Sequence, residues 1–327
     1  MKKTKSVARR GGWTVKAALR SMGGMLAALS LHASLPALHG SAEADSRPKK
    51  IIVLRSGDLP YYSLAVKEFV DTLRARNVLF AVEDRTLPRE EERGAFLQEL
   101  QAGLPDLVFT VGTPATIAVF QKKTLPFVYA MIMDPPALGV NTGGAVMETP
   151  PSIQLDFLRA HFPSFKRVGV IHSSTRNADY VRLLKETRTG ECSIVEVVAD
   201  TPQELDRAIS SLVGRADCLL MIPDSQLYSP QFSGQIILQT IRLGLPLIGV
   251  SPSYARAGAL AAVYPDYGDN GAVAADVAAQ YFGGQALSSI PPQWPRRTRY
   301  AVNLIVAERL GVPVDEKILD GADEVVR

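Results

Sequence analysis

Histidine and cysteine are scarce in this sequence of 327 residues, and their scarcity excludes several kinds of functional site. Only His161 and His172 follow residue 44, and neither has a partner at a metal-binding spacing. The chain also lacks the G-x-S-x-G, Walker A, G-x-G-x-x-G and C-x-x-C motifs of common catalytic and nucleotide sites. We therefore expect no metal, no cofactor and no enzymatic activity.

The two cysteines, Cys192 and Cys218, each stand at the start of a predicted strand. In a doubly wound sheet these strands would flank a third strand, which places the thiols too far apart for a disulfide. An oxidising compartment would permit a disulfide, but we expect two buried thiols.

A basic surface with interleaved aromatic residues is also missing, so we expect no nucleic-acid partner. The net charge of +3 comes from residues 1–44, which hold seven Lys or Arg and one Glu, so the remainder carries about −3. Residues 1–20 are basic, residues 22–35 form a short apolar run, and residues 42–44 supply an A-x-A cleavage site. This pattern predicts a signal peptide over residues 1–44 and a periplasmic protein. The Arg9-Arg10 pair leaves the Sec and twin-arginine routes both open.

The stretch 106–135 predicts one strand-turn-helix-strand unit of a parallel sheet. Residues 107–111 are almost wholly apolar, as in a strand covered on both faces. Thr113 can cap a helix with Pro114 in its first turn, and the N–H groups that open this helix, including that of Ala115, could bind an anion. Asp134 follows the next strand at the same edge. The structural alternative is that Thr113 only caps the helix and Asp134 only starts a turn.

Strand-helix units repeat along the chain in two blocks of comparable size. The expected strands are 51–54, 78–82, 107–111 and 127–131, then 168–171, 194–198, 218–222, 246–250, 259–263 and 298–302, and residues 143–147 carry the chain out of the first block. We predict an α/β fold of two Rossmann-like lobes with parallel sheets, joined by a hinge. Lobe 1 would comprise residues 45–145 and 256–290, and lobe 2 residues 146–255 and 291–327.

Polar and aromatic residues gather where these strands end, and they form the candidate ligand site. Hydroxyls and helix N-termini suit a carboxylate, aspartates suit an ammonium, and tyrosine rings suit an apolar body. Helix capping, an ordinary turn and packing remain the alternatives for Asp224, Asp266 and the tyrosines respectively. The candidates are Ser56, Thr113, Pro114, Ala115, Asp134, Ser173, Ser174, Asp224, Ser225, Tyr228, Ser251 and Asp266.

From about residue 50 to the end, the chain resembles the ABC-transporter substrate-binding protein family with a type I periplasmic binding fold. Some members of that family bind aromatic amino acids, and the fold joins its two lobes by three crossings. The motifs are VGTPAT at 111–116, MDP at 133–135, RVGVIHSS at 167–174, PDS at 223–225, ARAGALAAVYPDYGDNG at 255–271 and NLIVAERLGVPVDEKILDGADEVV at 303–326.

The resemblance implies that Thr113 and the next N–H groups face a ligand carboxylate, with Ser173 and Ser174 opposite. It also implies that Asp224 takes a ligand ammonium. The sequence departs from the amino-acid-binding members at 223–228 and 250–260, which places the ligand in question more than the fold.

These features predict an exported, monomeric solute-binding protein that captures an amino-acid-like or carboxylate ligand and delivers it to an ABC permease and ATPase complex. A ligand sensor that presents its closed state to a signalling receptor is the alternative. A secreted α/β hydrolase is the least favoured reading, because His172 and Ser173 have no evident orienting acid.

Overall fold

The computed structural model describes residues 47–122, 124–133, 141–175, 177–187, 192–224, 226–228 and 230–327. Residues 46–327 form one compact unit. The predicted signal peptide lies outside the described residues, as do the candidates Asp134 and Ser225. Among the residues described, no helix is both long enough and apolar enough to cross a membrane.

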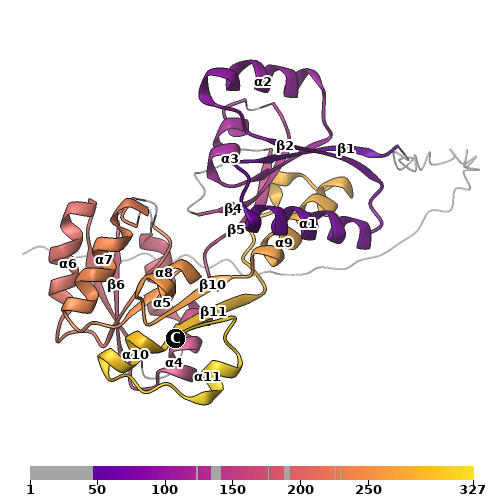
Figure 1. The fold of residues 1–327 in the computed structure, drawn as a ribbon. Helices are drawn as coiled ribbons and strands as arrows, with labels where there is room; N and C mark the ends of the chain where they lie inside the picture. Colours follow the sequence, from indigo (N-terminus) through magenta and orange to yellow (C-terminus); the bar gives the residue numbers. More distant parts are fainter. Residues whose placement is uncertain are drawn as a thin grey trace, which may run out of the picture. The chain divides into compact units, whose positions relative to one another are not determined.

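The first sheet contains five parallel strands in the order β2-β1-β3-β4-β5 (Figure 1). Their bounds are Lys49–Arg55 (β1), Phe80–Thr86 (β2), Leu107–Val111 (β3), Phe127–Ile132 (β4) and Thr142–Val146 (β5). Strand β2 begins later than the sequence predicts. The reason is that residues 76–79 close the preceding helix, where the N–H of Val78 bonds the carbonyl of Leu73 and Asn77 has φ 57°.

Two helices cover each face of this sheet. Helices α1 (Pro60–Ala75) and α9 (Tyr267–Phe282) pack on one face, and α2 (Glu90–Ala102) and α3 (Thr113–Phe120) on the other. Helices α1 and α9 lie side by side in Figure 1, and a Cβ added to Gly271 would lie 1.9 Å from the carbonyl oxygen of Ala65. Only glycine permits this approach. The predicted capping role of Thr113 is wrong, because the N-cap of α3 is Gly112 at φ 90° and Thr113 is the first residue of the helix.

The second sheet contains seven strands in the order β12-β11-β10-β9-β8-β6-β7. Neighbouring strands are parallel except β10 and β11, which are antiparallel. Their bounds are Arg167–His172 (β6), Ser193–Val198 (β7), Cys218–Leu220 (β8), Leu247–Gly249 (β9), Ala261–Pro265 (β10), Thr298–Asn303 (β11) and Glu324–Val326 (β12).

Helices again cover both faces of the second sheet. One face carries α4 (Pro151–His161), α5 (Ala178–Glu186), α10 (Leu304–Leu310) and α11 (Glu316–Asp320). The other carries α6 (Leu205–Leu212) and α7 (Pro230–Arg242), with α8 (Pro252–Ala257) beside them. Short 3-10 turns lie at Pro202–Glu204 (η1) and Leu287–Ser289 (η2). Sequence analysis missed α8, α11 and β12, which are too short to show a periodic pattern.

The chain passes between the two sheets three times: after β5, after β10 and before β11. The sequence-based division places all of residues 256–290 in lobe 1. Within that segment β10 pairs with β9 and β11 of the second sheet, whereas α9 packs on the first sheet. The crossing therefore falls between β10 and α9.

The crossings after β5 and before β11 are tied to each other by hydrogen bonds, and the second of them packs on a ring of α5. The N–H of Val146 donates to the carbonyl of Gln293, whose own N–H donates to Gly144, both at 2.9 Å. Trp294 stacks on Tyr180 with ring centroids 6.0 Å apart. Three separate segments thus meet at this point of the fold.

Asn270, at the start of α9, joins the ends of β4 and β5. Its Oδ1 accepts from the N–H of Met131 at 2.7 Å, and its Nδ2 donates to the carbonyl of Val146 at 2.7 Å. Met131 has φ 60°, an unusual value for a non-glycine residue. The fully buried Asn270 side chain therefore supports a strained irregularity of β4 near its carboxyl end.

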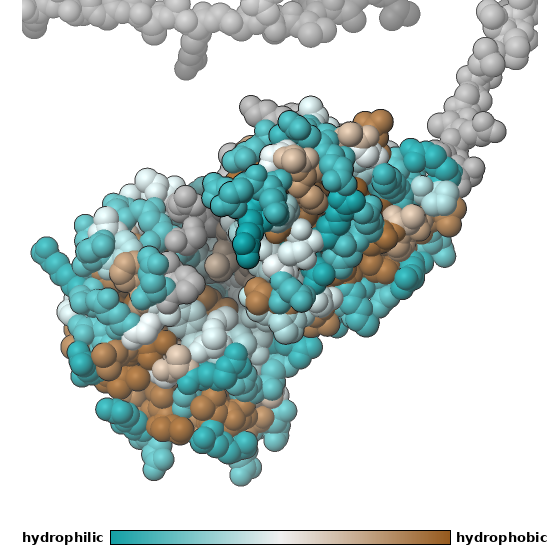
Figure 2. All heavy atoms as spheres, turned by 45° about the horizontal axis from the view of Figure 1, so that its top comes forward, coloured by the Kyte–Doolittle hydropathy of each residue, from teal (hydrophilic) through white to brown (hydrophobic). Residues whose placement is uncertain are grey.

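Polar and charged residues cover much of the face in Figure 2, and apolar residues appear in patches between them. Cys218 is buried in β8 and Cys192, just before β7, is half-buried; both are free. Strand β6 lies between β7 and β8, which confirms the predicted separation of the two thiols.

Candidate functional site

A cavity of about 450 Å³ opens where β8 and β9 of the second sheet end. Ile222, Pro223 and Asp224 after β8, and Val250 and Ser251 after β9, contribute to its lining. Residues of α7 and α8 complete that side, and Tyr61, Met133, Met147 and Tyr267 line the cavity from the first-sheet side. The volume is within the range of small-molecule sites.

Asp224 is the carboxylate of this cavity, and it is 2% exposed. Its Oδ2 accepts from the N–H and the hydroxyl of Ser173, at 2.9 and 2.8 Å. Its Oδ1 accepts from the N–H groups of Gln226 and Leu227, at 3.0 and 3.1 Å. The last two bonds form a turn well before α7 begins at Pro230, so Asp224 does not cap that helix.

The ionisation of Asp224 reflects a balance between burial and hydrogen bonding. Burial acts to raise the pKa of the carboxyl, but the bonds from Ser173, together with Asn177 and the N–H of Leu227, outweigh it and lower the pKa below its usual range. Among the described residues, no lysine, arginine or histidine pairs with Asp224. Within the part of the chain that the structure describes, the cavity therefore contains a buried negative charge that only neutral donors stabilise.

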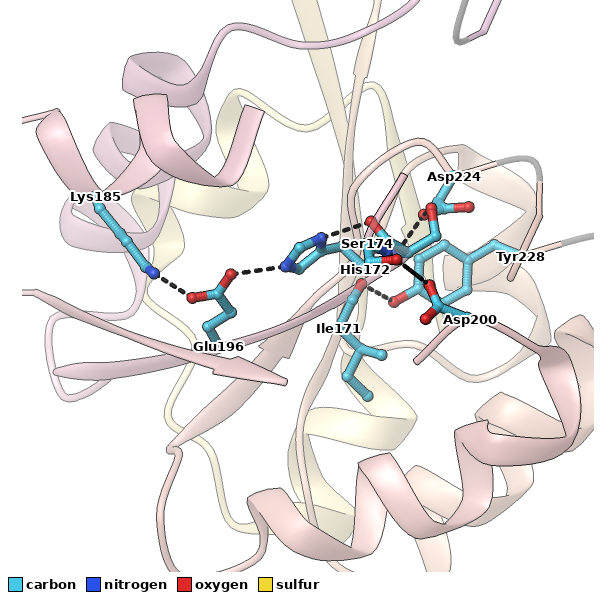
Figure 3. A network of polar contacts seen from close by, with 9 residues as sticks. Ile171, His172, Ser174, Lys185, Glu196, Asp200, Asp224 and Tyr228 are labelled. Carbon is cyan, nitrogen blue, oxygen red and sulfur yellow. Dashed lines mark hydrogen bonds and ion pairs between the residues drawn. The ribbon is translucent and has the colours of Figure 1, made fainter. Parts of the chain in front are cut away.

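Ser174 is directed toward Asp200 in the loop after β7, as Figure 3 shows, and Ser173 bonds Asp224 in the loop after β8. The N–H and hydroxyl of Ser174 both donate to Asp200, at 2.8 and 2.7 Å, in parallel with the bonds from Ser173 to Asp224. These two pairs join the loops after β6, β7 and β8. Neither serine lines the cavity, and the donors expected for a ligand carboxylate already bind protein carboxylates.

His172 takes part in a separate chain of contacts (Figure 3). Its Nε2 lies 2.8 Å from Oε1 of Glu196, its Nδ1 lies 2.9 Å from the Ser173 carbonyl oxygen, and Glu196 also pairs with Lys185. Hydrogen bonds from Lys185 and then His172 lower the pKa of Glu196. The imidazole thus bonds Glu196 and a carbonyl rather than the Ser173 hydroxyl, and this is not a nucleophile-base arrangement.

Tyrosines supply much of the cavity wall. Tyr61 and Tyr267 have ring centroids 5.5 Å apart, and Tyr254 also lines the cavity. Tyr228 lines it too, with its hydroxyl donating to the carbonyl of Ile171 at 2.7 Å. Burial, with a smaller contribution from Tyr61, raises the pKa of Tyr267 to about 12.

The cavity includes residues that the candidate set lacked. Tyr254 was missed because the short helix α8 looked like a loop, and Met133, Met147, Ser233 and Ser253 carried no distinctive signal. Of the sequence candidates, Asp224, Tyr228 and Ser251 line the cavity, and the Ser251 hydroxyl lies 2.6 Å from that of Ser253.

The first-sheet candidates lie apart from this cavity. The N–H of Ala115 donates to the hydroxyl of Ser56 at 3.0 Å, and Pro114 has no N–H to offer. Ser56, Thr113, Pro114 and Ala115 do not line the cavity that contains Asp224. The structure therefore does not bring together the two predicted halves of an amino-acid site.

Asp266 has a structural role in the described residues. Its Oδ1 accepts from the N–H of Asp269 at 3.0 Å and caps α9, and its Oδ2 pairs with Arg299 at 2.7 Å. Burial opposes ionisation, but these contacts lower the pKa of Asp266. In the part of the chain that the structure describes, no group of three acidic, histidine or cysteine side chains could hold a metal ion.

Comparison with known proteins places this geometry in context. Residues 89–326 match the profile of the family described as ABC transporter substrate binding protein. A curated tyrosine-binding protein from Clostridioides difficile (strain R20291) is 26% identical over 212 residues, 61% of either chain. The present chain thus spans about six-tenths of the length of that relative.

Solved structures share the fold. A ligand-free, open substrate-binding protein with adhesive properties from Clostridium difficile has a TM-score of 0.64 at 21% identity, over 85% of this chain and 99% of that one. An ABC domain in complex with L-Trp from Streptococcus pneumoniae has a TM-score of 0.57 at 20% identity, over 85% and 100%. The fold is that of the type I periplasmic binding proteins, as predicted. The chain belongs to the ABC transporter substrate-binding protein family, a class of solute-binding proteins rather than enzymes.

Proposed function

We propose that this protein is an exported monomer that captures a small amino-acid-like molecule in the cavity around Asp224 and delivers it to an ABC permease and its ATPase. The observation that carries the proposal is the buried Asp224 carboxylate, which among the described residues meets only neutral donors, in a cavity with tyrosine walls. A ligand ammonium would supply the missing positive charge. The tyrosine-binding relative supports an aromatic body for the ligand.

Release to a permease requires a protein that changes between open and closed forms. A ligand stabilises the closed form only through contacts that it makes with both lobes at once. In this proposal Asp224, Tyr228 and Ser251 hold the ligand from the second lobe. Ser56 and the start of α3, residues 113–115, would reach it from the first lobe on closure.

The proposal is tested by thermal unfolding of the chain from Asp45 onwards with aromatic and branched amino acids, small carboxylates, sugars and nucleosides. A ligand present at 100 times its Kd should add about 2.7 kcal/mol to the unfolding free energy, or several degrees in Tm. A rise with an amine-bearing compound that disappears in Asp224→Asn supports the proposal. A rise that survives this substitution would place the ligand elsewhere.

The delivery step has its own test. Proteoliposomes that contain the partner permease and ATPase should hydrolyse ATP faster when the liganded protein is added. The same protein without ligand should stimulate hydrolysis less. Equal rates in the two cases would argue against transport and direct attention to a signalling receptor.

A further inference from the structure

We propose that the cavity selects an organic cation: an ammonium attached to an aromatic or otherwise apolar body, with no requirement for a carboxylate. This inference rests on the proposed function, because it takes the cavity around Asp224 to be the ligand site. It goes beyond that function by assigning the charge class of the ligand.

The charge of the cavity is the first argument. Its described lining has one ionisable acid, Asp224, and no lysine, arginine or histidine. The remaining polar lining consists of serine and tyrosine hydroxyls, which are neutral. A bound cation therefore meets an opposite charge, whereas a bound carboxylate meets a like charge and no described counter-cation.

The tyrosine rings reinforce this selection. Tyr61, Tyr254 and Tyr267 line the cavity together with Asp224, and their ring faces carry the negative end of the aromatic quadrupole. Cations are attracted to such faces, most strongly where water is excluded. Rings beside a carboxylate form a site for an ammonium and the apolar group attached to it.

The hydrogen-bond donors supply an independent argument. A buried carboxylate needs donors, and those nearest to Asp224 are already used. Ser173 donates twice to Asp224, and Ser174 donates twice to Asp200. An amino acid would bring its own carboxylate close to Asp224 without a charged partner, and an amine avoids that cost.

Three compounds of one shape separate the charge classes: tyrosine, tyramine, which lacks the carboxylate, and 3-(4-hydroxyphenyl)propionate, which lacks the ammonium. Isothermal titration calorimetry with the chain from Asp45 onwards gives the three values of Kd. We expect tyramine to bind at least as tightly as tyrosine and the propionate not to bind. A Kd for tyramine more than about threefold above that of tyrosine would overturn the inference.

A variant at the rim tests the charge without disturbing Asp224. Ala257 lines the cavity with an exposed side chain, so Ala257→Lys adds a cation there and Ala257→Gln adds similar bulk without charge. We expect the lysine variant to weaken tyramine binding about tenfold relative to the glutamine variant. Equal affinities in the two variants would contradict the inference.

The outcomes distinguish this inference from the proposed function. One possible result is that tyrosine binds the unmodified protein more tightly than tyramine does and binds the Asp224→Asn variant more weakly. In that case the proposed function stands and the cation preference fails. If no amine in a wider aromatic and aliphatic panel binds, both fail.

Discussion

Three buried aspartates of the α9 segment differ from the buried Asp224 in the residues that surround them. Asp266, Asp269 and Asp276, in and before α9, are 5%, 5% and 8% exposed, and each faces an arginine. Asp224, at 2% exposed, faces only N–H and O–H groups of neutral residues in the part of the chain that the structure describes.

The difference separates a structural role from a binding role. The α9 carboxylates pair with arginines of residues 296–299, where the chain crosses to β11, so their charges hold that crossing in place. Among the described residues the charge of Asp224 has no such partner, and we propose that a ligand supplies one. The α9 aspartates and Asp224 are buried to a similar degree. The charge of the neighbouring groups, arginine or neutral donor, therefore distinguishes the structural role from the proposed binding role.

Asp224→Asn should have the largest effect, because it removes the one charge of the described cavity lining while preserving the shape of the side chain. We expect amine-bearing ligands to lose about 2 kcal/mol or more of binding free energy, about thirtyfold in Kd. Calorimetry measures this loss. Asp266→Asn is the matched control, since it retains the capping group and should bind ligand normally with lower stability. If both variants bound equally well, the comparison would fail.

Acid should remove the same interaction in the unmodified protein. The pKa of Asp224 in the folded protein is lowered, so its contribution to stability is present above the unfolded value near 3.8 and is lost as pH falls through the folded value. We expect ligand affinity to be flat from pH 7 to pH 5 and to fall steeply below about pH 4. Titrations between pH 7 and pH 3 check this, and loss of affinity near pH 6 would point to a group other than Asp224.

Asp276→Ala should affect stability and leave binding intact. The carboxylate pairs with Arg76 at 2.8 Å and with Arg296, but both arginines are largely exposed. We therefore expect a loss of about 1–2 kcal/mol, or about 2–4 °C in Tm. Asp179→Ala breaks an exposed pair with Arg182 and should leave Tm unchanged. An altered Kd in Asp276→Ala would show that the α9 aspartates and Asp224 are coupled.

Ser173→Ala should give the smallest effect, since it removes one of several neutral donors to Asp224. The expected cost is about 1 kcal/mol of unfolding free energy. With fewer donors to stabilise the carboxylate, the pKa of Asp224 should be higher in this variant. The loss of ligand binding in acid should therefore begin at a higher pH than in the unmodified protein. A pH titration of Ser173→Ala beside the unmodified protein detects this shift, and coincident curves would argue against it.

The sequence predicted most of the regular structure, because long strands and helices have clear periodic patterns. Strands β3 and β7 are found at or within a residue of their predicted bounds. The predicted cap at Thr113 failed because Gly112, at φ 90°, is the N-cap and Thr113 is the first residue of the helix. Strand β10 was assigned to lobe 1, although it pairs with β9 of the second sheet. The pattern of apolar residues indicates that a segment is a strand but does not indicate which strand it pairs with.

The candidate site was predictable in part. Asp224 was selected because it follows a buried strand, and it does line the cavity. Ser173 and Asp266 follow strands in the same way, yet their polar groups bond to Asp224 and Arg299. Position in the sequence brings a side chain to the correct edge of a sheet, whereas its bonding partners depend on loops that only the folded chain defines.

Asn270 supports the cavity from outside its wall, whereas other residues form the wall itself. Two main-chain groups, the N–H of Met131 and the carbonyl of Val146, determine that residue 270 must present both an acceptor and a donor. Met133 and Met147 follow shortly after these two groups and line the cavity. Their thioether side chains are not required to bond these main-chain groups. We therefore expect the residues at positions 133 and 147 to vary among related proteins that bind different ligands. The Asn270 amide should be retained, because a change of ligand does not alter the two main-chain groups that it bonds.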